Sequence, residues 1–290
     1  MQDSVLTQIV LPLILAVIMF GMGLSLTKDD FTRLWKTPKP IIVGLGGQVL
    51  ILPVLAFLVA IAFDLSADLA IGLMILAACP GGTMSNVISH LARANLALSV
   101  SLTAVTTVIC VFSTPWIIKF AIEQFSDTGG QEFSLLNTSL GLIFLTLLPV
   151  LLGIIVRHFW SEKALAVEPM FRKLSLGFMI VMIAAIVFQE RDLLIAYFGQ
   201  VFWATLALNL GSIAVGILLG KMSGLVVRDQ ITLGIEVGIQ NASMAMLIAV
   251  SFLSNPALAT SAGIYGLTMY IGAGLLALWA KKHNNVTESE

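Results

Sequence analysis

The sequence is poor in charged residues and contains very little cysteine or histidine. Among its 290 residues, 11% are charged, whereas a soluble domain usually carries about 25% to hydrate its surface. Hydrophobic residues make up 58% and the mean hydropathy is +1.01, which is typical of a chain whose solvent is the hydrocarbon of a bilayer. The composition therefore excludes an ordinary soluble domain and predicts a polytopic membrane protein.

The other shortages exclude several functions. A net charge of −1 leaves no basic excess for binding nucleic acid. The two cysteines, Cys79 and Cys110, lie in apolar runs and define no disulfide framework. Neither a Cys-x-x-Cys spacing nor a histidine cluster offers a transition-metal site. Because no nucleophile, base and orienting group form a set, we expect no enzyme and no cofactor.

Apolar runs predict an all-α membrane protein with nine transmembrane helices in a single domain, residues 1–290. Backbone groups in lipid must be hydrogen-bonded within their own segment, so spans of this length are expected to be helices. Positive charge follows the first run instead of preceding it, so this run is expected to be a retained helix and not a signal peptide. The predicted spans are Val5–Leu26, Pro40–Phe63, Asp68–Leu91, Asn95–Ile122, Ser134–Val156, Lys173–Phe188, Leu193–Leu219, Gln230–Leu253 and Ala257–Ala280.

Lysine and arginine indicate how these spans are oriented. Loops on one face hold only Lys119 and Arg191, together with the acidic residues Glu123, Asp127 and Glu132. We expect that face to be outside, with the N-terminus, and the short tail 282–290 to lie in the cytoplasm, as in a multi-pass protein of the inner (cytoplasmic) membrane. The opposite face collects Lys28, Arg33, Lys36, Lys39, Arg93, Arg157, Lys163, Arg172, Lys173, Lys221, Arg228, Lys281 and Lys282. None falls deep in a predicted span, so we expect no side-chain cation beside a buried substrate.

One carboxylate, Glu236, falls well inside a predicted span, whereas the other fifteen of the sixteen acidic residues are expected in loops, helix ends or tails. A charge at that depth costs at least about 2.5–3.5 kcal/mol, so an intramembrane carboxylate indicates function. The alternative is a protonated glutamate that only hydrogen-bonds to a neighbouring helix. Gly234 and Gly238 flank it and Gln240-Asn241 follow, which predicts local unwinding around a cavity.

A second polar cluster, Cys79 to Asn86, interrupts the third span with Pro80-Gly81-Gly82. Proline removes a backbone donor and glycine weakens a helix interior, so we expect two half-helices, the second capped by Thr83 and Ser85. A simple proline kink is the alternative. The third and eighth spans hold corresponding places in the two halves of the chain, which predicts inverted repeats of four and five helices, residues 4–123 and 134–281, whose broken helices cross near the membrane midplane.

Three further polar side chains lie within spans: Gln48, Ser99 and Thr103. Ser99 and Thr103 are four residues apart and therefore share one helix face. On spacing alone, each of the three could equally serve helix packing.

These residues carry a resemblance to a known family. The run from Ala78 to Val100 resembles the broken-helix signature of the bile acid:sodium symporter (BASS/SBF) family, and Glu236 to Asn241 is similar to its second signature. Met22-Gly23-Leu24 before Asp29-Asp30-Phe31 resembles the end of its opening helix. The resemblance implies a bacterial member that lacks the first of the usual ten helices, with a panel part and a core part.

The resemblance also implies two sodium sites and a substrate cavity. The first sodium site would use Ser85, Asn86, Ser99, Thr103 and Glu236. The second would use Gln48, Glu236, Val237, Ile239 and Gln240, with the apolar residues binding through their carbonyls, since sodium prefers oxygen ligands. Thr83 and Asn241 match positions facing the substrate. The last helix reads Thr268-Met269-Tyr270 where many bacterial members have Trp-His-Asn, so substrate contacts there are not carried over.

Together these observations predict sodium-coupled symport of a small organic anion by alternating access, with sodium ions, the anion and membrane lipid as partners. The alternatives are a proton-coupled carrier in which Glu236 carries the proton, an uncoupled carrier, and arsenite-type metalloid efflux using Cys79. A non-transporting membrane sensor is the alternative from another class, although no sizeable soluble domain is evident in the sequence.

Overall fold

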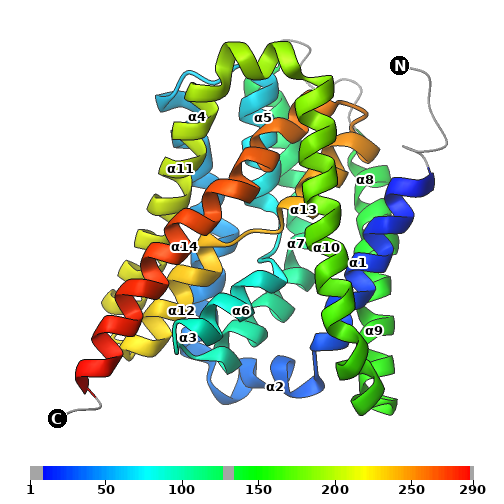
Figure 1. Cartoon of the computed structure of the whole chain (residues 1–290). Coiled ribbons are helices and arrows are strands. Elements are labelled where there is room, and N and C mark those ends of the chain that lie inside the picture. Colours follow the sequence, from blue (N-terminus) through cyan, green and yellow to red (C-terminus); the bar gives the residue numbers. More distant parts are fainter. Residues whose placement is uncertain (1–8, 127–133, 288–290) are drawn as a thin grey trace.

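The computed structural model describes residues 9–126 and 134–287. Every regular element in these residues is helical, and the helices form one bundle (Figure 1). The all-α fold expected from the composition is therefore confirmed. Asp127 and Glu132 of the predicted acidic loop, the first eight residues and the last three lie outside the described residues.

Within the described residues, six helices are long and apolar enough to cross a membrane. They are Pro38–Ala62 (α3, η2 and α4), Leu96–Phe125 (α7), Leu135–Phe159 (α8, η3 and α9), Ser161–Gln189 (α10), Arg191–Met222 (α11) and Pro256–Ala280 (η5 and the membrane part of α14, Ala259–Thr287). Helix α1 (Leu11–Ser25) qualifies when it is joined to α2 (Lys28–Lys36), from which it is bent by 62°. A total of nine spans also requires both broken helices to cross, and it stays a prediction.

The broken helices lie where the proline and glycine residues predict them. Helix α5 (Ala67–Ala78) is followed by α6 (Thr83–Leu91), and α12 (Val227–Gly238) is followed by α13 (Ala242–Leu247) with η4 (Ile248–Phe252). Each pair is separated by a short extended segment instead of a mere kink. The expected cap on α6 is wrong: its N-cap is Gly82 without a side-chain hydrogen bond.

The predicted start of the sixth span is also wrong. Helix α10 begins at Ser161, twelve residues before Lys173, because a hydropathy window detects the apolar segment and not the amphipathic turns that precede it. Glu168 and Arg172 therefore lie within this helix, four residues apart on one face, and not in a loop.

Two groups of helices pack against each other. Helices α1, α8–α9 and α10 form what we call the panel, and the remaining long helices with both broken pairs form the core (Figure 1). The panel helices pack closely because α1 is glycine-rich: a Cβ on Gly23 would lie 2.2 Å from the Val150 carbonyl oxygen. The broken pairs meet inside the core, beside the panel, and this arrangement positions the candidate site.

Candidate functional site

The two chain breaks cross and bond to each other in the middle of the bundle. The Gly82 amide donates to the Ile239 carbonyl at 3.3 Å, and the Asn241 amide donates to the Pro80 carbonyl at 3.0 Å. Gly81 and Gln240 thus pair as an isolated antiparallel bridge. Because these bonds use only some of the groups freed by unwinding, polar backbone atoms remain at the crossing, where buried polar groups need partners.

Glu236 lies on α12 directly before this crossing and is 1% exposed. Its Oε1 accepts hydrogen bonds from Ser85 Oγ at 2.5 Å and from Ser99 Oγ, while Oε2 accepts from Thr103 Oγ1 at 2.9 Å. Ser99 Oγ also lies 2.9 Å from Asn86 Oδ1. The structure therefore brings together all five residues expected in the first sodium site.

The second expected set gathers on the other side of Glu236. Gln48 lies in the π-helical segment η2 (Gly46–Ile51), and its Nε2 is 3.4 Å from Gln240 Oε1. Gln240 Nε2 donates to the Val237 carbonyl at 2.9 Å, and the Ile239 carbonyl accepts only the Gly82 bond noted above among the bonds of the described residues. Gln48 is 1% exposed, yet its Oε1 has no hydrogen-bond partner in the described part of the chain.

This donor set fits a hard monovalent cation. Hydroxyl, amide and carbonyl oxygens surround a single carboxylate, which is the ligand chemistry that sodium shares with calcium. Ser99 has one hydroxyl hydrogen but two oxygen neighbours, Glu236 Oε1 and Asn86 Oδ1, so the cluster holds more acceptors than hydrogens. Gln48 Oε1 is a further buried oxygen without a hydrogen-bond donor in the described residues, and a bound cation would satisfy it.

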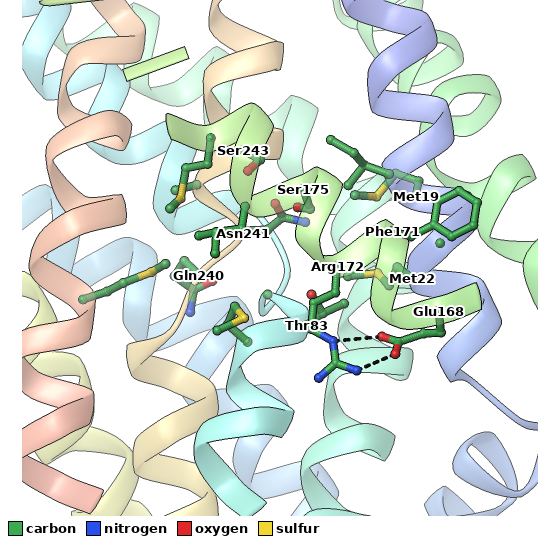
Figure 2. Close-up of a pocket in the computed structure, with 18 of the residues that line it drawn as sticks. Met19, Met22, Thr83, Glu168, Phe171, Arg172, Ser175, Gln240, Asn241 and Ser243 are labelled. Carbon is green, nitrogen blue, oxygen red and sulfur yellow. Dashed lines mark hydrogen bonds and ion pairs between the residues drawn. The ribbon is translucent and has the colours of Figure 1, made fainter. Parts of the chain in front are cut away.

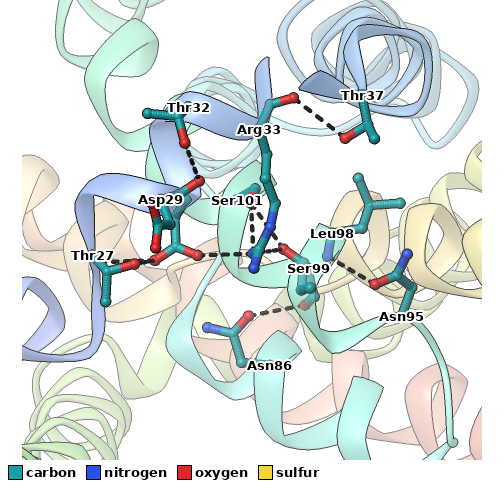
Figure 3. Close-up of polar contacts among 12 residues, drawn as sticks. Thr27, Asp29, Thr32, Arg33, Thr37, Asn86, Asn95, Leu98, Ser99 and Ser101 are labelled. Atoms are coloured by element: carbon teal, nitrogen blue, oxygen red, sulfur yellow. Dashed lines mark hydrogen bonds and ion pairs between the residues drawn. The ribbon is translucent and has the colours of Figure 1, made fainter. Parts of the chain in front are cut away.

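Polar contacts attach α2 to α7 (Figure 3). Arg33 on α2 donates to the Ala97 carbonyl at 2.9 Å and to Ser101 Oγ at 3.3 Å, and it pairs with Asp30 at 3.0 Å. Ser101 lies two residues after Ser99, so α2 is attached to the helix that carries two of the expected ligands. The sequence indicated Arg33 only as an orientation signal.

Two residues that the sequence analysis missed hold the broken end of α12. Asn209 Nδ2 and the Tyr265 hydroxyl both donate to the Gly238 carbonyl, at 2.8 and 2.9 Å. Both side chains are fully buried. They satisfy the carbonyl that unwinding leaves free and thereby fix the direction of the chain towards Ile239. Single polar residues in long spans carry no signal that identifies such a partner.

A pocket lies between the panel and the crossing (Figure 2). Thr83 and Asn241, the expected substrate residues, both line it, with Gln240 beside them. Asn241 Oδ1 accepts from the Met244 amide at 3.0 Å and caps α13, so its Nδ2 is the group that it can offer to a ligand. Met269 and Tyr270 form part of the wall at the place where the sequence departs from many bacterial relatives.

The expectation of no side-chain cation beside the substrate region is wrong. Arg172 on α10 lines the same pocket and forms an ion pair with Glu168. When charged residues are assigned by the predicted spans, both residues fall in a loop. Their i,i+4 spacing is nevertheless typical of an ion pair on a helix surface. Cys79, by contrast, is fully buried and is not among the pocket residues.

Comparisons with known proteins agree with this geometry. A model of the Sodium Bile acid symporter family matches residues 12–197. The sodium-dependent transporter YocS of Bacillus subtilis is 31% identical over 270 residues, which cover 92% of this chain and 82% of the relative. The probable chloroplastic sodium/metabolite cotransporter BASS1 of Arabidopsis thaliana is 30% identical, with 92% and 66% covered.

The human ileal sodium/bile acid cotransporter is 28% identical over 251 residues, covering 84% of this chain and 70% of the relative. These relatives are named as sodium-dependent transporters or cotransporters, and the apolar helices are those of a multi-pass membrane protein. The chain therefore belongs to the sodium bile acid symporter family, a family of membrane transporters and not of enzymes.

Proposed function

We propose that the protein is a sodium-coupled symporter that imports a small organic monoanion by alternating access. One observation carries this proposal: the buried carboxylate of Glu236 is surrounded by hydroxyl and amide oxygens where two broken helices cross. Broken helices that meet at a polar centre are the usual construction of ion and substrate sites in secondary transporters.

Two sodium ions would bind beside Glu236. Ser85, Asn86, Ser99 and Thr103 would hold the first, and Gln48, Gln240 and the carbonyls of Val237 and Ile239 would hold the second. With both ions bound, Glu236 cancels one of two positive charges and leaves about +1. The amides at the N-terminus of α6 add a partial positive charge of roughly half an elementary charge, so the site favours a monoanion near Thr83 and Asn241.

We further propose that residues 4–123 and 134–281 are inverted repeats and that the core moves against the panel. The shared backbone bonds between Gly82 and Ile239 and between Asn241 and Pro80 support this, because both broken helices would then move as one unit. The cation and the anion would then cross the membrane bound to the same moving unit, as cotransport requires.

Anion binding is expected to depend on sodium. Bound sodium supplies the positive charge that attracts the anion, and the bound anion in turn favours sodium binding. The two affinities are therefore linked reciprocally. Titration calorimetry of the purified protein with a small monocarboxylate should give an affinity at least tenfold higher in sodium than in choline buffer. Equal affinity in both buffers, or preference for a cationic ligand, would contradict the proposal. Uptake driven by a proton gradient without sodium would instead favour Glu236 as a proton carrier.

The proposed topology places the N-terminus outside and the C-terminus in the cytoplasm of the inner membrane. Figure 1 supports opposite sides for the two ends of the chain, because α1 begins and α14 ends at opposite ends of the bundle. Cysteine labelling of two exposed positions tests it: Asp192→Cys, in the first turn of α11, should react with an impermeant reagent outside, and Lys163→Cys, in the first turn of α10, should not. Cys79 and Cys110 are buried and provide the low background. The reverse pattern would refute the orientation.

A further inference from the structure

The pocket between panel and core contains one ion pair, Glu168 with Arg172, among the residues that line it. We infer that Arg172 is the residue with which the panel recognises the substrate, and that Glu168 positions it. The substrate is then a monoanion with a carboxylate or similar oxyanion and an apolar body. This inference rests on the proposed function and adds a second side of the binding site, opposite Thr83 and Asn241.

The geometry is that of an anchored guanidinium. Glu168 Oε1 accepts from Arg172 Nε at 3.2 Å, and Glu168 Oε2 accepts from Nη2 (Figure 2). A guanidinium has five N–H donors, so this bidentate contact leaves three for another acceptor. The Glu168 side chain is 12% exposed and that of Arg172 is 35% exposed. The carboxylate is therefore the more buried partner, and the guanidinium, which lines the pocket, keeps three donors uncommitted.

An ordinary stabilising role would not require this arrangement. An i,i+4 pair on a helix stabilises it only slightly, and burying a carboxylate is unfavourable unless it is paired. A buried acid that orients a partly open guanidinium is instead suited to bidentate recognition of an oxyanion.

The charges of the pocket select a monoanion. Arg172 and Glu168 together are neutral, so the +1 left by two sodium ions and Glu236 remains for the substrate. No second basic residue is among those lining the pocket in the described chain. A dianion would lack a counter-charge, and a cation would meet a guanidinium whose open donors cannot accept a hydrogen bond.

Several other lining residues are apolar and adaptable. Met19, Met22 and Met179 line the pocket from the panel, and Met269 lines it from the core. Methionine side chains are flexible and fill irregular spaces, so they suit an aliphatic or cyclic body of variable shape. The oxyanion of such a substrate would contact the core through Asn241 and the panel through Arg172, so substrate binding would connect the two parts that move.

The test measures binding of three probes, 2-methylbutyrate, cyclohexanecarboxylate and cholate, each compared with its neutral amide, in sodium buffer. The wild type should bind at least one acid and should bind the matching amide at least tenfold more weakly. Arg172→Gln should weaken binding of that acid at least tenfold and remove most of its preference over the amide. Lys173→Gln is the matched control, since it removes the same charge from the next residue, which is exposed and outside the pocket.

Removing Arg172 alone leaves Glu168 unpaired, so a second variant guards against misfolding. Arg172→Gln combined with Glu168→Gln removes both charges and should also lose the acid preference. In every variant, stabilisation by sodium without substrate is measured by thermal shift and should stay unchanged. If Arg172→Gln and the double variant bind the acid as the wild type does, Arg172 is no recognition residue, although the sodium proposal stands. If the wild type binds no acid in sodium, both proposals fail.

Discussion

Glu236→Gln is expected to abolish sodium-dependent uptake while the protein still folds and inserts. The substitution keeps the shape of the side chain and removes its charge. Ser85, Ser99 and Thr103 currently donate to the carboxylate, but a hydroxyl can also accept a hydrogen bond. The three hydroxyls can therefore accommodate the glutamine amide, so the fold survives and only the cation loses its charged ligand.

The expected size of this effect is large. Hydrogen bonds to charged groups contribute about 1.5–3 kcal/mol, and each 1.4 kcal/mol changes a binding constant about tenfold. Because Glu236 contacts both proposed ion sites, its loss should weaken sodium binding by a factor of roughly 100 or more. Sodium-gradient uptake into proteoliposomes, together with sodium-dependent thermal shift, measures both consequences.

Glu162→Gln provides the control, since Glu162 is exposed at the start of α10. This substitution removes the same charge at a position distant in sequence from the crossing, so sodium-dependent uptake should be unchanged. Normal sodium-driven uptake by the Glu236→Gln protein would show that Glu236 is structural. The proposed ion sites would then be wrong, because no other carboxylate contacts these hydroxyls in the described residues.

Much of the crossing could be predicted from the sequence because its signals are local. A carboxylate inside an apolar segment and a Pro-Gly-Gly run in another are visible without any knowledge of the fold. Their meeting was predicted from the corresponding places of the two breaks, and the backbone bridge between Gly81 and Gln240 bears this out. The roles of the gathered residues as ligands remain a prediction.

Features that depend on distant partners could not be predicted. Asn209 and Tyr265 converge on the Gly238 carbonyl from two different long helices, and nothing in either span indicates that target. The sequence predicts a loop position for Arg172, because a hydropathy window ends where charged residues begin. The helix nevertheless continues through Glu168 and Arg172, and both residues line the pocket.

The predicted cap of α6 fails for a related reason. Thr83 and Ser85 have the right residue types for capping, but the Ser85 hydroxyl donates to Glu236 instead. Gly82 takes the cap position because the second broken helix passes so closely: a Cβ there would lie 3.2 Å from the Gln240 carbonyl oxygen. Tertiary contacts at the crossing thus override the local preference.

A small side chain added at Gly81 should weaken sodium binding. A Cβ at Gly81 would lie 3.1 Å from Glu236 Oε2 and 3.3 Å from Gln48 Nε2. It would press against the carboxylate that the two ion sites are proposed to share and against the amide of the second site. Overpacking of this kind costs about 1–3 kcal/mol, which corresponds to about a tenfold or larger loss of sodium affinity.

A graded series tests this expectation. Gly81→Ala should weaken sodium-dependent thermal stabilisation about tenfold in apparent affinity, and Gly81→Val should abolish it because its branched side chain would enter the ion sites. Gly46→Ala is the matched control: it lies two residues before Gln48, and a Cβ there meets nothing within 4 Å. Alanine is the better helix former, so this variant should bind sodium normally. Equal losses in both alanine variants would mean that general helix packing, and not the crowded ion site, explains the effect.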